Sequence, residues 1–546
     1  MAFSTSTIAT KPESPPPKDT PSDLERQDPP KSQQPSETDM TASSCQSHTL
    51  PSSRWRRFLA SLTPEEGEVY HPDTERSGKP KWYRRLLDAG LEENGVKPVP
   101  IEERTSTQYG NLFTVFFTCL MCLLPIPTGM LATLGTGLSL RDASLTILFF
   151  GLLTCIPPAF MGIGGMETGM RQLVQARYSF GLYLVTIPLL FNAATLTGFS
   201  LLSSVVGGQA LAALDPTRIS VEVGIIVACV VSFAVSFLGF RAVHFWERWT
   251  WIPNLISIVI AVGCGGKYLH LQADAEPATP AKVLSLGGLI AGYFITFGGT
   301  VSDYSIYHNP RKASRTRVFL YIYLGLLLPS IPLLILGCAI GGAVPNVPEW
   351  HLAYHSTGIG GVMAAMLSPA GGFGRFVLVL LALSIIGNIT MSMYSIALNL
   401  QMLIPLFARV PRAVFILVAM ALMAPMAVRA AHQWEESLGN FLAVIGYWAG
   451  CFDAVLIEEL VVFRGLDYSS YDHAIWNVGR KLPPGLAAMG ASLASLGLVI
   501  PGMAAPWYTG PIAKVTGDIG FEIAFVGTAL VYFPLRSLET RWRGDL

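Results

Sequence analysis

Leu378–Gln401 reads LVLLALSIIGNITMSMYSIALNLQ, a hydrophobic run with polar side chains in its middle. It is long enough to cross a bilayer as a helix, which takes about 20 residues. Asn388, Thr390, Ser392 and Ser395 fall in mid-span. Because hydrocarbon penalises a polar group without a partner, we expect these side chains to face a helix bundle or a wet cavity. The stretch therefore predicts a membrane protein with many helices and something to bind at its middle.

The composition of the whole chain agrees with a membrane protein. Of its 546 residues, 51% are hydrophobic and only 14% are charged, whereas about a quarter of the residues in soluble domains are charged. The formal net charge is zero, so no basic excess points to a nucleic-acid partner. The expected partners are the lipid bilayer and small molecules, and not nucleic acid.

The cysteines raise the question of a metal or redox site. Cys119 and Cys122 form a CxxC pair, a spacing that suits a metal or a dithiol. No second CxxC and no nearby histidine completes a zinc site, and cysteine in an apolar segment behaves as a small hydrophobe. We favour the hydrophobic interpretation and predict neither a metal nor a cofactor.

The N-terminal part of the chain differs from the rest in composition. The first 53 residues are rich in Pro, Ser and Thr, cannot bury enough apolar surface to fold, and are predicted to be a disordered cytosolic tail. Residues 54–108 form a pre-membrane segment. Its two basic-aromatic stretches, Arg54–Leu62 and Lys79–Leu91, either lie on an anionic leaflet or stay in water. The transmembrane domain is expected over 109–536, with a short cytosolic tail over 537–546.

Twelve apolar runs are candidates for membrane-spanning helices. Lys and Arg are denser in the loops after even-numbered runs than after odd-numbered ones, and such charges mark the cytosolic side. We therefore predict an all-α membrane protein with about 12 transmembrane helices and both termini in the cytosol. Residues 344–374 are expected to be a loop. The runs cover 109–138, 142–163, 182–206, 222–240, 250–268, 283–305, 318–343, 374–404, 412–430, 437–462, 485–505 and 519–536.

Two of these helices are predicted to be broken. The first contains Leu124–Gly129 (LPIPTG), where each proline removes a backbone donor and clashes with the preceding turn. The sixth contains Thr296–Asp303 (TFGGTVSD), with paired glycines and an acid. Helices one and six are equivalent in a fold of two inverted five-helix repeats, where broken helices mark a midplane binding site. The alternative is two unrelated kinks, which membrane helices tolerate.

Recognisable sequence blocks run from about Trp82 to the C-terminal end: Ala89–Thr105, Gly164–Gly181, Val206–Gln209, Gly371–Ser384, Tyr447–Arg464 and Tyr471–Gly485. Together they resemble the purine–cytosine permease branch of the nucleobase–cation symporter family, and its fungal members most of all. The resemblance implies a leucine-transporter-like fold of 5+5 inverted repeats plus two extra helices. It also implies alternating access and proton-driven import of purines or cytosine, normally at the plasma membrane.

The same resemblance implies a substrate site between helices one, three, six and eight, where an aromatic ring stacks on the base and polar groups read its edges. The permease pattern on helix eight resembles A-N-N-I-P-N-M-Y-S, and this chain reads GNITMSMYS over Gly387–Ser395. One amide is kept as Asn388, and Ser392 stands where a later Asn is usual. These two positions are four apart and so share one helix face.

The remaining implied contacts come from helices three, one and six. Phe199 keeps an aromatic residue at the implied stacking position, and Ser203 replaces an Asn. Pro125 stands where relatives show a Ser at the first break, and Phe297 lies in the second break. The breaks at Pro125–Gly129 and Phe297–Asp303 are expected to supply free backbone groups and hinges.

The differences from the permease pattern fall on positions that should touch substrate. A site built to hydrogen-bond a substrate discriminates strongly. We therefore favour a changed substrate range, which includes another small heterocycle such as a B-vitamin, over drift around an unchanged substrate. Asp303 is a candidate for proton coupling or gating, because an acid in a broken membrane helix is costly. It could equally cap the break.

Two further classes of function compete with transport. A transporter-derived sensor would bind ligand and signal through the long N-terminal tail without moving solute. A membrane-embedded enzyme is the weakest alternative, because no nucleophile–base constellation or metal-ligand set lies at membrane depth. We therefore predict that the protein is not an enzyme.

Overall fold

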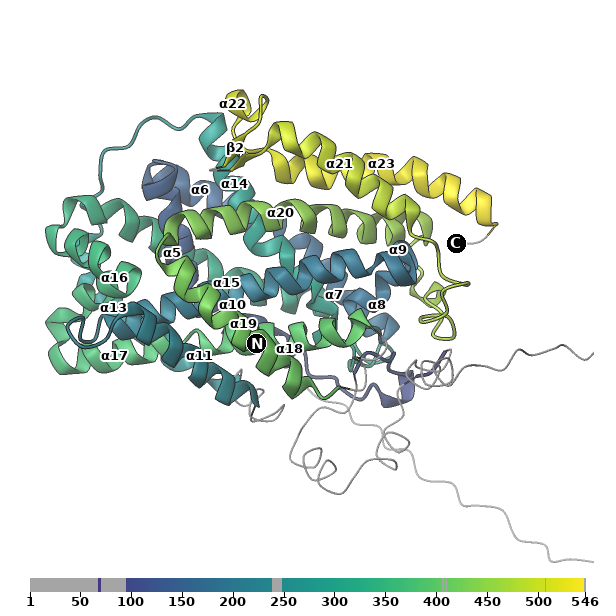
Figure 1. Cartoon of the computed structure of the whole chain (residues 1–546), viewed down its shortest axis with the longest axis horizontal. Helices are drawn as coiled ribbons and strands as arrows, with labels where there is room; N and C mark the ends of the chain where they lie inside the picture. The colour runs from purple at the N-terminus through teal and green to yellow at the C-terminus, as the bar shows by residue number, and fades with distance from the viewer. Residues whose placement is uncertain are drawn as a thin grey trace, which may run out of the picture. The chain divides into compact units, whose positions relative to one another are not determined.

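In the computed structural model, residues 67–69, 95–237, 248–404, 407, 410–505 and 507–544 are described. The predicted tail over 1–53 and both basic-aromatic stretches lie outside these residues. The described chain is mostly helical (Figure 1). Its one sheet is a short antiparallel pair of β1 (Ala504–Ala505) and β2 (Tyr508–Thr509).

Each of the twelve predicted runs contains helix where it is described. The first five runs contain α4 (Tyr109–Leu120), α5 (Pro125–Met130), α6 (Leu140–Thr154), α7 (Ile156–Thr168), α10 (Thr186–Ala212), α11 (Val221–Phe237) and α13 (Trp251–Gly265). The other runs contain α14 (Pro280–Ile295), α15 (Arg315–Ala343), α17 (Gly371–Leu383), α18 (Ile386–Leu403), α19 (Arg412–Ala431), α20 (Trp434–Glu458), α21 (Leu486–Gly502) and α23 (Gly520–Arg543). Short helices α8 (Gln172–Gln175), α9 (Arg177–Leu184) and α22 (Ala513–Thr516) connect them.

The lengths and hydropathy of these helices identify a multi-pass membrane protein. Among the described residues, eight helical stretches are long and apolar enough to cross a bilayer, or nine if α4 and α5 count as one span. Helices α11 and α21 are apolar but shorter. The all-α prediction is confirmed, and the number twelve stays a prediction.

Both predicted breaks are present. Helix α4 ends at Leu120, and the chain restarts at α5 with a bend of 62°, continuing as a π-helical turn, η2 (Leu131–Gly135). Helix α14 gives way to two 3₁₀ turns, η4 (Thr296–Gly299) and η5 (Val301–Tyr304). The causes are those read from the sequence, proline at the first break and paired glycines at the second.

The predicted loop over 344–374 is wrong, because it contains α16 (Pro348–Leu367). This helix escapes an apolar count because its first half is polar. It bends at Thr357–Gly358, where Gly358 adopts φ +61°. Its second half is glycine-rich and approaches α10 closely: a Cβ at Gly360 would lie 2.2 Å from the carbonyl carbon of Gln209.

Two predicted boundaries also move. The run 374–404 is two helices, because the chain turns between α17 and α18 at Ser384 and Ile385. The last helix, α23, continues beyond the predicted end at 536 to Arg543.

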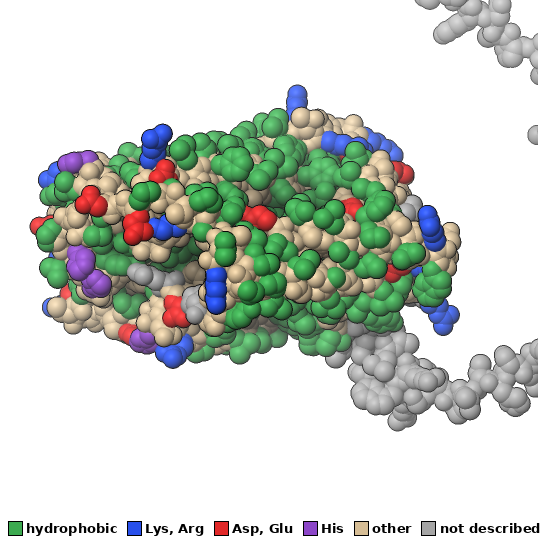
Figure 2. All heavy atoms as spheres, turned by 90° about the horizontal axis from the view of Figure 1, so that it is seen from above, with side chains coloured by type: hydrophobic (Ala, Val, Ile, Leu, Met, Phe, Trp, Pro, Cys, Tyr) green, Lys and Arg blue, Asp and Glu red, His purple; other side chains and the backbone are tan. Residues whose placement is uncertain are grey.

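The broken first helix packs against α15, and α10 packs against α18 and α11. Helix α20 lies between α10 and the α21–α23 pair (Figure 1). Large apolar side chains are exposed on outer helix faces, for example Phe149 on α6 and Leu422 on α19, and they cover much of the face in Figure 2. A water-soluble protein rarely exposes so much apolar surface, whereas in a bilayer this surface meets lipid.

Candidate substrate site

One cavity lies where helices one, three, six and eight meet. Its empty space is about 470 Å³, a figure that includes the solvent space at its open side. Its walls come from α4 and the first break, α10, α14 with its 3₁₀ continuation, and α18. The described lining residues are Cys119, Leu120, Leu124, Thr195, Leu196, Phe199, Tyr293, Thr296, Phe297, Thr300, Asn388, Met391, Ser392 and Ser395.

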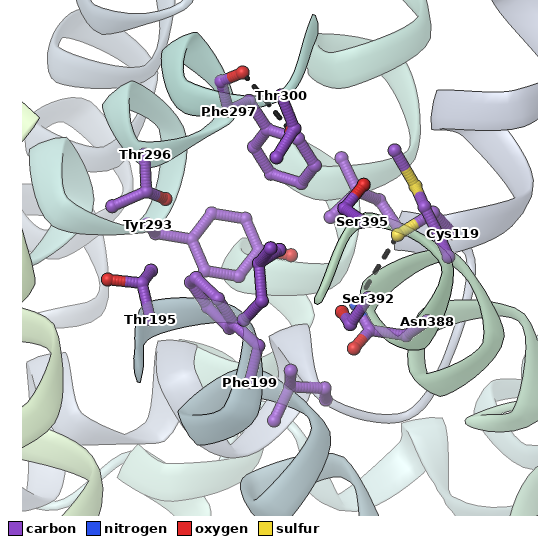
Figure 3. Close-up of a pocket in the computed structure, with 14 residues that line it drawn as sticks. Cys119, Thr195, Phe199, Tyr293, Thr296, Phe297, Thr300, Asn388, Ser392 and Ser395 are labelled. Carbon is purple, nitrogen blue, oxygen red and sulfur yellow. Dashed lines mark hydrogen bonds between the residues drawn. The ribbon is translucent and has the colours of Figure 1, made fainter. Parts of the chain in front are cut away.

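The aromatic rings gather on one side of the cavity, together with three threonines, and Asn388 lies on the other side with two serines and Cys119 (Figure 3). Phe199 packs edge-to-face on Tyr293 at 6.3 Å and on Phe441 at 5.1 Å between ring centroids. Phe297 packs edge-to-face on Phe116 at 6.1 Å. Such pairs fix ring orientation, so the cavity offers preset apolar faces to a planar ligand.

Asn388 is the central polar group on the opposite side. Its Oδ1 accepts a hydrogen bond from Ser203 Oγ at 2.8 Å, and its Nδ2 donates to Cys119 Sγ at 3.4 Å. A thiol sulfur is a weak acceptor. The Asn388 N–H can therefore leave Cys119 and donate to a stronger acceptor on a bound ligand. Ser203 therefore orients the amide so that its donor end faces the first helix and the cavity.

The C-terminal part of the second break, at Asp303 and Tyr304, makes hydrogen bonds and ring contacts with neighbouring helices. Asp303 Oδ1 accepts a hydrogen bond from the backbone N–H of Gln172 on α8 at 3.0 Å. Tyr304 Oη lies 3.2 Å from Ser395 Oγ, and its ring packs edge-to-face on Phe116 at 5.6 Å. Ser395 lines the cavity on α18, so the contact from Tyr304 joins the second break to that helix. The other two contacts join the break to α8 and α4.

Comparison with known proteins gives this arrangement a family. Residues 98–479 match the family described as "Permease for cytosine/purines, uracil, thiamine, allantoin". The chain belongs to this permease family. It is 32% identical to purine-cytosine permease fcyB of Emericella nidulans, over 85% of this chain and 92% of that one. It is 28% identical to purine-cytosine permease FCY2 of Saccharomyces cerevisiae, over 88% and 92%. With vitamin B6 transporter TPN1 of the same yeast the identity is 27%, over 84% and 90%.

The fold of the permease has a solved counterpart. The nucleobase-cation-symport-1 family transporter Mhp1, in a closed conformation with bromovinylhydantoin bound, superposes with a TM-score of 0.63. The match covers 83% of this chain and 96% of Mhp1 at 17% identity. An inward-facing conformation of Mhp1 superposes with the same score. The predicted leucine-transporter-like fold is thereby confirmed.

The structure brings together four of the six predicted substrate residues. Phe199, Phe297, Asn388 and Ser392 all line the cavity. Ser203 does not line it and lies behind Asn388, fully buried. Pro125 does not line it either, because it begins α5 inside the bundle, and the first break contributes Leu124 instead. Asp303 also lies outside the lining.

Two backbone groups at the first break are already used within the protein. Met121 O accepts a hydrogen bond from Asn254 Nδ2 at 3.0 Å. Leu123 N donates to Ser384 Oγ at 3.1 Å. Both groups lie just before the predicted range Pro125–Gly129, so the expectation that this range supplies free backbone groups stays a prediction.

Several lining residues were missed in the sequence. Tyr293 precedes Phe297 by four residues, and Thr195 precedes Phe199 by four, so both share a helix face with a predicted contact. That spacing could have revealed them. Cys119 was set aside as a small hydrophobe, and nothing in the sequence pairs it with Asn388.

Proposed function

We propose that this permease is a secondary active transporter that imports purine bases or cytosine by proton symport with alternating access. The observation that carries the proposal is the cavity itself, in which preset aromatic faces oppose an oriented amide at the middle of a membrane helix. A nucleobase is flat and has hydrogen-bonding groups around its rim, and stacking plus hydrogen bonds recognises both features.

Each residue has a proposed role. Phe199 stacks on the ring, with Phe297 on the helix-six side, and Asn388 Nδ2 donates to an acceptor on the base. Ser203 holds the amide in that orientation, and Ser392 adds a hydroxyl. Pro125 maintains the bend that brings Leu124 to the cavity. Asp303 acts in gating, because it joins helix six to the segment after helix two.

The proposed setting is the plasma membrane, with both termini in the cytosol as the loop charges favour. Two alternatives keep the same cavity. Similarity to vitamin B6 transporter TPN1, together with the loss of amides on helix eight, supports a vitamin-like heterocycle. A ligand sensor would bind at the cavity without accumulating solute.

Uptake in cells that lack their own nucleobase permeases tests the proposal. We expect acid-stimulated uptake of labelled adenine, hypoxanthine or cytosine by the wild type. In Asn388→Ala, loss of one buried hydrogen-bond network costs about 1–3 kcal/mol, or roughly 5- to 150-fold in uptake at low substrate concentration. Thr390→Val is the matched control, because Thr390 bonds to Ser236 away from the cavity.

The panel of substrates separates the alternatives. Uracil and pyridoxine are measured in parallel, with protein at the cell surface quantified. Uptake of pyridoxine alone would support the vitamin carrier, and the absence of all uptake from well-expressed protein would reject the nucleobase proposal.

Alkylation of Cys119 can detect ligand binding even if no solute is transported. Its thiol lines the cavity, so a bound base should slow its reaction with a small membrane-permeant alkylating reagent, measured by mass spectrometry of the Cys119 peptide. Cys264, which lies outside the described lining and is partly exposed, is the internal control. Protection of Cys119 with no uptake would indicate a sensor, and equal rates with and without base would place ligand elsewhere.

A further inference from the structure

Asp453 is a buried acid that has no role among the residues of the proposed substrate site. It lies on α20 near the middle of the stretch Glu436–Phe463 and is 0% exposed. Neither of its carboxyl oxygens has a hydrogen-bond partner among the described residues. An intramembrane acid of this kind is a candidate functional group by default.

No described charge compensates Asp453. The ionisable groups nearest in sequence on α20 have other partners or none. Cys451 Sγ donates to Ala524 O, Tyr447 donates to Asp518, and Glu458 Oε2 has no hydrogen-bond partner in the described structure. Glu459 binds Arg464 and Arg536. The described ionisable side chains on other elements that pack against α20 are Glu167 on α7, Arg177, Tyr178 and Tyr183 on α9, Lys282 and Tyr293 on α14, Arg412 and Arg429 on α19, and Glu522, Tyr532, Arg536, Glu539, Arg541 and Arg543 on α23.

The carboxyl group sits directly against the broken part of helix six. A Cβ built on Gly298 would lie 2.2 Å from Asp453 Oδ1 and 2.4 Å from Oδ2. The next glycine is held by Asn192 of α10, whose Nδ2 donates to Gly299 O at 3.2 Å. Phe297, immediately before this pair, lines the cavity. One face of the segment therefore meets the ligand cavity while Asp453 packs behind it.

A second contact links the same helix to the cavity. Trp448 Nε1 on α20 donates to Thr195 Oγ1 at 2.9 Å, and Thr195 lines the cavity on α10. Helix α20 thus touches two of the four walls, so a change at Asp453 reaches the ligand site through direct packing.

The chemistry of the surroundings decides which form of Asp453 fits them. An ionised carboxylate loses its hydration on burial, and without a cation or donors that loss is uncompensated. A protonated carboxyl group has no net charge, so it loses far less hydration free energy when it is buried. The packed arrangement of α20 on η4 therefore suits the protonated acid, and opening of helix six would admit the water that an ionised acid needs.

We propose that Asp453 binds the coupling proton, a role that rests on the proposed transport function. On the external side a hydronium ion gives its proton to the carboxylate: one hydronium O–H bond breaks, a carboxyl O–H bond forms, and water leaves. Helix six then closes on the neutral acid and the substrate. When the site opens to the cytosol, the carboxyl O–H bond breaks and the proton passes to water, while the electron pair stays on the carboxylate. Proton and base then cross together, because closure requires both.

Infrared spectroscopy of the full chain in lipid vesicles tests the proton directly. We expect a protonated-carboxyl C=O stretch at neutral pH that disappears in Asp453→Asn. Glu436→Gln is the matched control, since Glu436 is an exposed acid on the same helix. If the spectrum instead assigns an ionised carboxylate to Asp453 at neutral pH, the proposal is overturned.

Transport in the same vesicles tests the coupling. With the membrane potential clamped at zero, one proton moving down one pH unit supports about tenfold accumulation of base. Asp453→Asn and Asp453→Ala should accumulate none, yet still exchange labelled for unlabelled base, which also shows that they fold. Wild-type-like accumulation in either variant would overturn the coupling role. If the wild type accumulates no base, the proposed function fails, and the infrared band alone decides whether Asp453 holds a proton.

Discussion

Arg536→Ala is expected to lower the free energy of unfolding by about 3–5 kcal/mol, the usual cost of removing one partner from a buried ion pair. Arg536 on α23 is fully buried. Its Nε and Nη2 donate to both oxygens of Glu459 at 2.9 and 2.8 Å, and its Nη1 donates to Glu539 at 2.7 Å. Arg464 also binds Glu459, at 3.0 Å.

This cluster fastens the end of α20 to the last helix. Without the guanidinium, Glu539 loses its hydrogen-bonded cation and Glu459 loses a bidentate one, while both stay buried. Glu459 would keep Arg464, and Glu539 would have no cationic partner among the described ion pairs. The free energy of unfolding of Arg536→Lys should lie between those of the wild type and Arg536→Ala, because an ammonium group keeps the charge but cannot make the bidentate contact.

The measurement is an unfolding titration of the purified protein with a denaturing detergent. Arg541→Ala is the matched control, since Arg541 is an exposed arginine on the same helix, and surface changes of this kind usually stay within about 0.5 kcal/mol. Equal midpoints for Arg536→Ala and Arg541→Ala would mean that the buried cluster contributes nothing to stability.

The features that the sequence predicts well are those with a local physical cause. Proline at the first break and paired glycines at the second interrupt a helix wherever they occur. Asn388 stands out because an amide in an apolar run needs a partner. In each case the signal lies within a few residues of the feature.

The features that the sequence misses depend on distances between helices. Asp453 is notable for its surroundings: the packing of α20 places its carboxyl group against Gly298, and neither carboxyl oxygen has a hydrogen-bond partner among the described residues. Ser203 and Pro125 were placed by analogy with substrate contacts, but side-chain direction within the bundle puts them behind the cavity wall. Helix α16 was missed because its polar half breaks the apolar run that marks a span.

Gly298→Ala is the second change with a large expected effect. The new methyl group would lie 2.2 Å from Asp453 Oδ1, far inside contact distance, so η4 or α20 must shift. Such overpacking costs typically about 1–3 kcal/mol, which corresponds to roughly 5- to 150-fold in the closing equilibrium and hence in uptake. Gly288→Ala on the preceding helix is the matched control, because its methyl group would meet nothing nearer than 3.9 Å.

The double variant Gly298→Ala with Asp453→Ala separates the geometry of this contact from its chemistry. Removing the carboxyl group gives the new methyl group space, so exchange of labelled base should recover towards that of Asp453→Ala alone. Accumulation driven by a pH gradient should not recover, because the proposed proton carrier is gone. Recovery of neither activity would show that Gly298 is needed for a reason other than contact with Asp453. Recovery of both activities would confirm the steric contact between Gly298 and Asp453 but would reject Asp453 as the proton carrier.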